Sequence, residues 1–130
     1  MIFPALTAFY AGLFGLLFIL LSVWVSAGRA QFRAHHGDAG DVRLQRRIRI
    51  QANFAEYVPI ALILIGLCEA GGSAPSMVRA LLIALLVARL VHPFGMVAPE
   101  GSLQQYALRA PAMMATWTVI VVASLMALFH

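Results

Sequence analysis

Two long stretches of this sequence contain no charged side chain, one at each end of the chain. The first covers residues 1–28 and the second covers residues 110–130. Each is long enough to cross the hydrocarbon core of a bilayer as a helix, which takes about 20 predominantly apolar residues. The pattern therefore predicts one membrane-spanning helix at each end of the sequence.

Two further apolar runs lie between these stretches and predict two more spans. One follows Glu56 as far as Cys68, and the other covers residues 77–97 with only Arg79 and Arg89 as charged interruptions. A turn rich in glycine, serine and proline separates the two runs, as in a short hairpin. We predict a single domain covering residues 1–130, with transmembrane helices at about 2–26, 47–70, 76–97 and 103–129.

Composition agrees with an all-α integral membrane bundle. Hydrophobic residues make up 62% of the chain, charged residues make up only 11%, and the mean hydropathy is +0.90. The first apolar run does not have the pattern of a cleaved signal peptide, because no basic segment precedes it and it is longer than the apolar core of such peptides.

The arginines predict the orientation of the helices, since the chain has no lysine. Most of them lie between the first and second spans: Arg29, Arg33, Arg43, Arg46, Arg47 and Arg49. Because basic loops stay in the cytoplasm, we expect the first and third loops inside and both termini outside. The same arginines suit the anionic headgroups of membrane lipids. The net charge is only +4 and the arginines cluster at one membrane face, so a sequence pI near 10.2 does not indicate a nucleic-acid partner.

A polar stripe runs along the start of the second span. At 100° per residue, Arg46, Arg49, Asn53 and Glu56 fall on one helical face about 80° wide. The stripe carries both signs of charge into an apolar helix, and charged groups at membrane depth are functional candidates by default. Arg89 of the third span needs a partner, and an ion pair between Glu56 and Arg89 is geometrically feasible as either a functional or a purely structural feature.

Other reactive residues give weaker indications. Cys68 is the single cysteine, lies in an apolar run and is expected to be a small buried side chain. His35, His36, Asp38 and Asp41 have metal-ligating side chains, but a short polar loop has the same composition, so we predict no metal site.

The segment around the polar stripe resembles the second-helix signature of a known family. Its residues are Arg46, Arg49, Gln51, Asn53, Glu56, Tyr57 and Pro59. The family is MAPEG, the membrane-associated proteins of eicosanoid and glutathione metabolism, which includes microsomal glutathione transferases and the leukotriene-C and prostaglandin-E synthases. The length and the four-helix layout are similar over nearly the whole chain.

The resemblance implies a homotrimer that binds glutathione between neighbouring subunits near the cytoplasmic side, while a lipophilic small molecule enters from the bilayer. Glutathione has two carboxylates and one ammonium group, which suit guanidinium and carboxylate partners respectively. By the resemblance, Arg49 holds a carboxylate, Glu56 the γ-glutamyl ammonium, and Asn53 with Gln51 the peptide groups. The remaining binding residues implied are Arg29, Arg46, Tyr57, Arg89 and His92.

The sequence departs from the eukaryotic members near the start of the fourth helix. Those members carry an arginine there that is thought to activate the thiol, whereas this chain has Gln104, Gln105 and Tyr106, with Arg109 about one turn further. A thiolate needs a nearby cation. Arg109 is therefore the first candidate for thiol activation, and Arg29 is the second, although Arg109 could simply anchor the helix at the membrane interface.

Three functions remain open at this point for a protein expected in a bacterial inner membrane. The first is a glutathione-dependent transferase or peroxidase acting on lipophilic electrophiles or hydroperoxides. The second is a non-catalytic membrane protein of the MAPEG type that binds lipid or glutathione. The third is a small four-helix transporter that uses Glu56, which is disfavoured because Arg46 and Arg49 would repel a cationic substrate.

Overall fold

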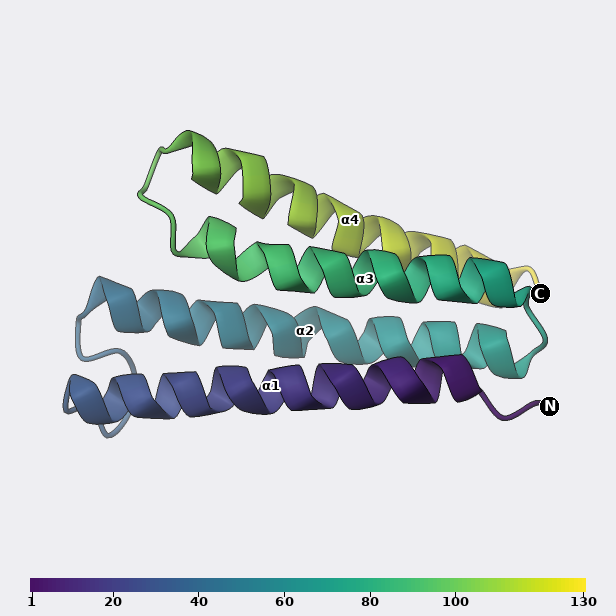
Figure 1. The fold of residues 1–130 in the computed structure, drawn as a ribbon, viewed down its shortest axis with the longest axis horizontal. Coiled ribbons are helices and arrows are strands. Elements are labelled where there is room, and N and C mark those ends of the chain that lie inside the picture. The colour runs from purple at the N-terminus through teal and green to yellow at the C-terminus, as the bar shows by residue number, and fades with distance from the viewer.

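Four antiparallel α-helices make up the whole structure, a computed structural model that describes residues 1–130 (Figure 1). They are α1 (Ala5–Gln31), α2 (Val42–Ala70), α3 (Pro75–Met96) and α4 (Leu103–Leu128). All four are long and apolar enough to span a membrane, so the predicted four-helix transmembrane fold is confirmed. The α1–α2 and α3–α4 loops lie at one end, and the α2–α3 turn lies at the other end beside both termini (Figure 1).

The helix ends at the arginine-rich side differ from those predicted. The helix α1 continues to Gln31, beyond the expected end at residue 26, and α2 begins at Val42 rather than at residue 47. Asp41 explains the early start, because its carboxylate accepts hydrogen bonds from the backbone N–H groups of Arg43 (2.8 Å) and Leu44 (3.4 Å) and caps the helix. A hydrogen bond from the Arg43 side chain lowers the pKa of this carboxyl below its usual value.

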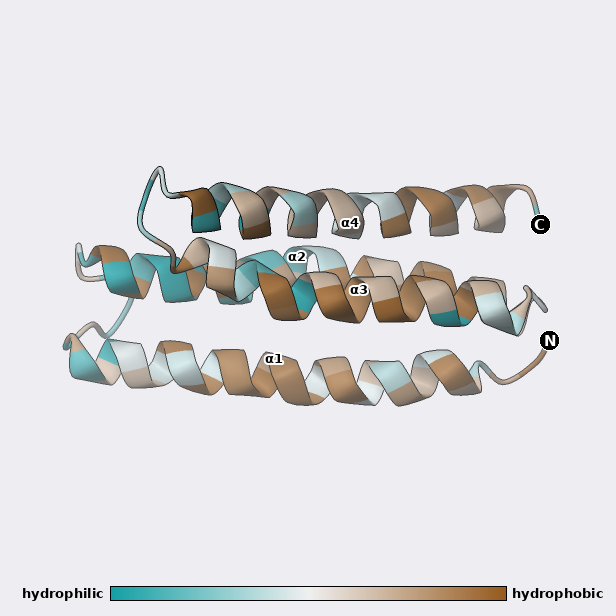
Figure 2. Cartoon of the chain, turned by 45° about the horizontal axis from the view of Figure 1, so that its top comes forward, coloured by the Kyte–Doolittle hydropathy of each residue, from teal (hydrophilic) through white to brown (hydrophobic).

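Apolar side chains cover the outside of the bundle as well as its interior. Only 26 of the 130 residues are buried, and large hydrophobic side chains are exposed on every helix. Figure 2 shows the hydrophobic colour along most of the helices and the hydrophilic colour concentrated at the arginine-rich start of α2. An apolar exterior with a polar end is the pattern expected of a protein whose outer surface contacts lipid.

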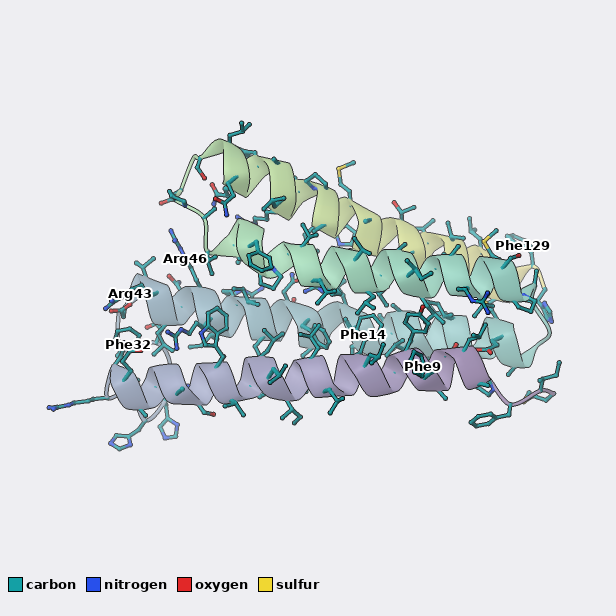
Figure 3. The ribbon with its side chains drawn as sticks, viewed as in Figure 1. Phe9, Phe14, Phe32, Arg43, Arg46 and Phe129 are labelled. Atoms are coloured by element: carbon teal, nitrogen blue, oxygen red, sulfur yellow. The ribbon has the colours of Figure 1, made fainter.

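The helices α2 and α3 are central to the packing, because each contacts all three other helices, whereas α1 and α4 do not contact each other. Phe14 of α1 packs against Phe54 of α2, and the core continues through Leu82 and Leu85 of α3 to Val119 of α4. At the arginine-rich end, the guanidinium of Arg43 lies 4.5 Å from the ring centre of Phe32 (Figure 3).

Glu69 of α2 is hydrogen-bonded to α1 at the opposite end of the bundle, a role that the sequence pattern did not predict. Its carboxylate accepts hydrogen bonds from the backbone N–H groups of Leu6 (2.9 Å) and Thr7 (2.8 Å), and from the Thr7 hydroxyl (2.7 Å). The helix α1 has no side-chain cap of its own at Pro4. A residue near the end of α2 therefore caps the start of α1.

Candidate functional site

A cleft of about 720 Å³ lies between α2, α3 and α4 in the half of the bundle nearest the arginine-rich end. Its volume is in the range of pockets that hold small organic ligands. Most of its walls come from three stripes, one on each helix, whose residues are spaced four apart. Residues at this spacing share one face of a helix. The stripes are Arg49, Asn53 and Tyr57 on α2, His92 and Met96 on α3, and Gln105, Arg109, Met113 and Trp117 on α4.

Arg49 and Glu56 form an ion pair beside this cleft. Arg49 Nη1 lies 3.4 Å from Glu56 Oε1, and the two side chains are 52% and 50% exposed. The stripe predicted from helical periodicity is thus present on one face of α2. A half-exposed pair of charges within a membrane-spanning helix is costly next to lipid, so this face requires a polar ligand, water or another protein surface against it.

The ion pair between Glu56 and Arg89 that the sequence suggested is not formed, because Glu56 pairs with Arg49 on its own helix. Arg89 is only 2% exposed. Its Nη1 atom lies 3.8 Å from the Met113 sulfur, and its guanidinium carbon lies 5.8 Å from the ring centre of Phe54. Neither is a counter-ion.

Three buried polar side-chain atoms have no hydrogen-bond partner, and two of them belong to residues that line the cleft. They are Asn53 Oδ1, Arg89 Nε and His92 Nδ1. Buried polar groups in proteins almost always have a partner. Asn53 and His92 line the cleft itself, so a bound ligand or water can reach them.

Arg109 lines the cleft from α4, where the two helices α3 and α4 approach each other closely. A side-chain carbon on Gly95 would lie 2.5 Å from the Arg109 backbone nitrogen and 2.8 Å from its Cα. Glycine at this position is therefore what allows the α4 backbone to come so near to α3. This approach sets the position of Arg109 at the cleft.

Arg46 lies at the lip of the cleft, on the side that the predicted orientation places in the cytoplasm. Its Nη1 atom donates to the Ala98 carbonyl at 3.5 Å and so joins the start of α2 to the α3–α4 loop. A smaller hollow of about 300 Å³ adjoins the cleft here and is lined by Arg46, Arg49, Arg109 and Glu100 among others. Anionic groups of a ligand would meet three guanidinium groups at this lip.

Two of the predicted site residues lie away from the cleft in the same chain. Arg29 donates from Nε to the Gly37 carbonyl at 3.2 Å, within the first loop. Gln51 donates to the Ser22 hydroxyl at 3.3 Å and so faces α1. Gln51 faces away from the cleft because two residues turn a helix by about 200°, which places Gln51 opposite Arg49. Of the other eight predicted residues, Arg46 lines the adjoining hollow, and Glu56 and Arg89 line neither hollow nor cleft. The five that line the cleft are Arg49, Asn53, Tyr57, His92 and Arg109.

Eight cleft residues were absent from the predicted site: Met96, Glu100, Gly101, Gln105, Tyr106, Ala110, Met113 and Trp117. Met113 and Trp117 follow Arg109 at the same four-residue spacing, a signal that could have found them. Glu100 belongs to the α3–α4 loop, and its position depends on how the helices pack. In the first loop, Asp38 and Asp41 accept local backbone hydrogen bonds. No three His, Cys, Asp or Glu side chains lie close enough to hold a metal ion.

Comparison with known proteins identifies the family of this chain. The model of the MAPEG family matches residues 7–129, and the chain therefore belongs to the MAPEG family. The inner membrane protein YecN of Escherichia coli K12 is 36% identical over 124 residues, which cover 95% of this chain and 91% of YecN. YecN of Escherichia coli O6:H1 gives the same values. No solved structure gives a significant match to the chain.

Family membership confirms the resemblance of the α2 segment to the MAPEG signature. The similarity to an inner membrane protein and the four long apolar helices confirm an integral protein of the inner membrane. The expected orientation, with the first and third loops in the cytoplasm and both termini outside, stays a prediction.

Proposed function

We propose that this protein is a glutathione-dependent membrane transferase or peroxidase that acts on lipophilic electrophiles or hydroperoxides. The observation that supports it best is the Arg49–Glu56 ion pair beside a cleft large enough for a tripeptide. The γ-glutamyl end of glutathione carries an ammonium and a carboxylate on one carbon. It can replace the ion pair by giving its carboxylate to Arg49 and its ammonium to Glu56.

The other polar residues suit the rest of the tripeptide. Asn53 has an unpartnered acceptor oxygen at the cleft, which can accept from a peptide N–H. Arg46 and Arg109 at the lip offer guanidinium groups for the glycine carboxylate. Tyr57 and His92 also line the cleft.

The apolar part of the cleft suits the second substrate. Met96, Met113 and Trp117 line it, and the exposed face of α4 continues it with apolar side chains. A lipophilic molecule dissolved in the bilayer can therefore reach the cleft without crossing water.

The chemistry starts with loss of the thiol proton to water. In conjugation, the sulfur forms a bond to an electrophilic carbon of the substrate, and the bond from that carbon to the leaving group breaks. In hydroperoxide reduction, the sulfur takes the terminal oxygen as the O–O bond breaks, and the alkoxide takes a proton to give the alcohol. A second glutathione then converts the oxidised sulfur to the disulfide and releases water.

The proposed site is completed by a second copy of the chain in a homotrimer. Arg29 and Gln51 lie off the cleft of their own chain, so they can contribute to a glutathione site only from a neighbouring subunit. The half-exposed charges of Arg49 and Glu56 are shielded from lipid in such an assembly.

Turnover assays test this function. Purified protein is given glutathione with a nitro-substituted aromatic chloride, and separately with an alkyl hydroperoxide. We expect activity in the wild type and a loss of about tenfold or more in Arg49→Ala and Glu56→Gln, because each removes a charge-assisted contact worth about 1.5–3 kcal/mol. Arg79→Gln is the control, since Arg79 is exposed at the far end of α3. Binding of glutathione without any turnover would instead indicate the non-catalytic function.

A further inference from the structure

Two arginines of α2 stack on aromatic rings of the α1 end, away from the cleft. The guanidinium carbon of Arg47 lies 4.9 Å from the ring centre of Trp24, and that of Arg43 lies 4.5 Å from the ring centre of Phe32 (Figure 3). Arg43 and Arg47 are one helical turn apart and share a face of α2. Arg47 lines neither the cleft nor the adjoining hollow, so these contacts are separate from the proposed glutathione site.

The direction of the Arg47 side chain is fixed by three contacts with α1. Its guanidinium lies over the Trp24 ring, and its Nη1 atom donates to the Trp24 carbonyl at 3.1 Å. Gly28 makes room for it, since a side-chain carbon there would lie 3.1 Å from Arg47 Nη1 and 3.3 Å from its Cδ. A guanidinium that is already held in place loses little side-chain freedom when it binds a ligand.

Arg47 has no counter-ion in the chain. The two ion pairs that form are Arg43 with Asp41 and Arg49 with Glu56. The one side-chain hydrogen bond of Arg47 goes to a neutral carbonyl, and the residue is partly exposed. A guanidinium has five N–H donors, so most of those on Arg47 are free for an anionic ligand.

The position of Trp24 and Arg47 along the helices matches the surface of a membrane. Residues 1–28 carry no charge, and the first charged residue, Arg29, follows Trp24 by little more than one helical turn. Tryptophan is enriched at the level of the lipid headgroups, and basic side chains at this level attract anionic lipids. The segment 29–49 contains six arginines and two aspartates, so its net charge also favours an anion.

We propose that Arg47, held over Trp24, binds the phosphate of an anionic phospholipid in the leaflet at the arginine-rich end. The phosphate accepts hydrogen bonds from the free N–H groups of Arg47. Leu20 and Leu16 precede Trp24 at four-residue spacing and are 67% and 69% exposed, so an acyl chain can follow this apolar face of α1.

The charges at this end favour an anionic over a zwitterionic phospholipid. Both lipids have the same phosphate, but the zwitterionic one also carries an ammonium group. The carboxylate nearest in the chain, that of Asp41, is already paired with Arg43 at 3.0 Å. The ammonium would therefore meet an excess of positive charge and no free partner.

A competing interpretation is that Arg47 only joins α1 to α2. In that case the protein has no preference between lipids, and replacement of Arg47 lowers its stability equally in every lipid. Lipid retention in native mass spectrometry separates the two interpretations. The full-length protein in mild detergent is mixed with equal amounts of phosphatidylglycerol and phosphatidylcholine that have the same acyl chains, and the lipids that stay bound are compared.

We expect the wild type to retain phosphatidylglycerol over phosphatidylcholine by about fivefold or more, the preference that one arginine near an anionic lipid provides. In Arg47→Gln the ratio should fall to near one. Arg33→Gln is the matched control, because Arg33 is exposed in the first loop, forms no ion pair, and loses the same charge. This control should keep the wild-type ratio.

Two outcomes overturn the site. A wild-type ratio near one shows that the protein does not select anionic lipid. An equal loss of preference in Arg47→Gln and Arg33→Gln shows a general attraction of the basic end and no site at Arg47.

Two further measurements keep the test decisive. If Arg47→Gln does not fold, Arg47→Lys replaces it, because lysine keeps the charge but not the planar fork of donors. Its ratio should fall to half of the wild-type value or lower, and a full wild-type ratio contradicts a site built on the guanidinium. Inorganic phosphate added in excess should not displace bound phosphatidylglycerol, and displacement would show that the site takes a free anion and not a lipid.

Discussion

Substitution of Gly95 by alanine tests whether the close approach of α3 and α4 shapes the cleft. The added carbon would lie 2.5 Å from the Arg109 backbone nitrogen, 2.8 Å from its Cα and 2.9 Å from its Cβ. Ordinary contacts between non-bonded carbon atoms are about 3.5–4.0 Å, so α4 must move away from α3 by roughly 1 Å. Two of the three atoms belong to the backbone, and a change of side-chain rotamer cannot relieve the contact.

The cost follows from that displacement. Forcing an extra carbon into a packed helix contact destabilises a protein by about 1–3 kcal/mol. Arg109 and the α4 wall of the cleft move with the helix, and a misplacement of about 1 Å can lower a rate by about 100-fold. We therefore expect Gly95→Ala to lose both stability and most of the glutathione-dependent activity.

The control is Gly12→Ala, at a helix position where an added carbon meets no atom within 4 Å. Alanine should be neutral there or stabilise α1 by up to about 1 kcal/mol, because glycine is a poor helix former. Unfolding in a titration with denaturing detergent measures both variants against the wild type. Equal stability of the two variants, together with unchanged turnover in Gly95→Ala, would refute the role assigned to Gly95.

Three other predictions concern the ends of the bundle and its assembly. Glu69→Ala should destabilise the protein by about 2–4 kcal/mol in the same unfolding titration, because it leaves the first N–H groups of α1 without an acceptor. Glu69→Gln keeps one acceptor oxygen and should cost clearly less. Equal losses of stability in the two variants would show that Glu69 does not stabilise the fold by accepting these hydrogen bonds. The pKa of Asp41 is lowered in the folded protein, so its cap stabilises the fold above the ordinary carboxyl pKa and loses this effect as pH falls through the lowered value. The stabilities of wild type and Asp41→Ala should therefore differ at neutral pH and converge in acid. A difference in stability that is independent of pH would contradict this. Native mass spectrometry from mild detergent should give a trimer, and a stable monomer would count against the shared site.

The sequence predicts the membrane-spanning helices well because each span is a local property. A charge-free stretch such as residues 1–28 has few alternatives in a bilayer. The ends of α1 and α2 were predicted less well, because helix continues past the apolar region where polar residues such as Asp41 stabilise it. Hydropathy shows which part of a helix lies in the membrane, but not where the helix begins or ends.

The site was predictable along one helix but not between helices. Helical periodicity correctly placed Arg49, Asn53 and Glu56 on one face of α2. It could not show that Glu56 pairs with Arg49 and leaves Arg89 unpaired, because that depends on the rotation of α3 against α2. The cap that Glu69 provides to α1 joins residues 62 and 63 positions apart in the chain, and no local pattern encodes it.

Equilibrium binding of glutathione to the purified wild-type protein tests the central claim most directly. Isothermal titration calorimetry in mild detergent should show saturable binding, which Arg49→Ala and Glu56→Gln each weaken by about tenfold or more and Arg79→Gln leaves unchanged. Unchanged affinity in both cleft variants would place the ligand elsewhere, and the absence of binding to the wild type would contradict glutathione as the ligand of this cleft.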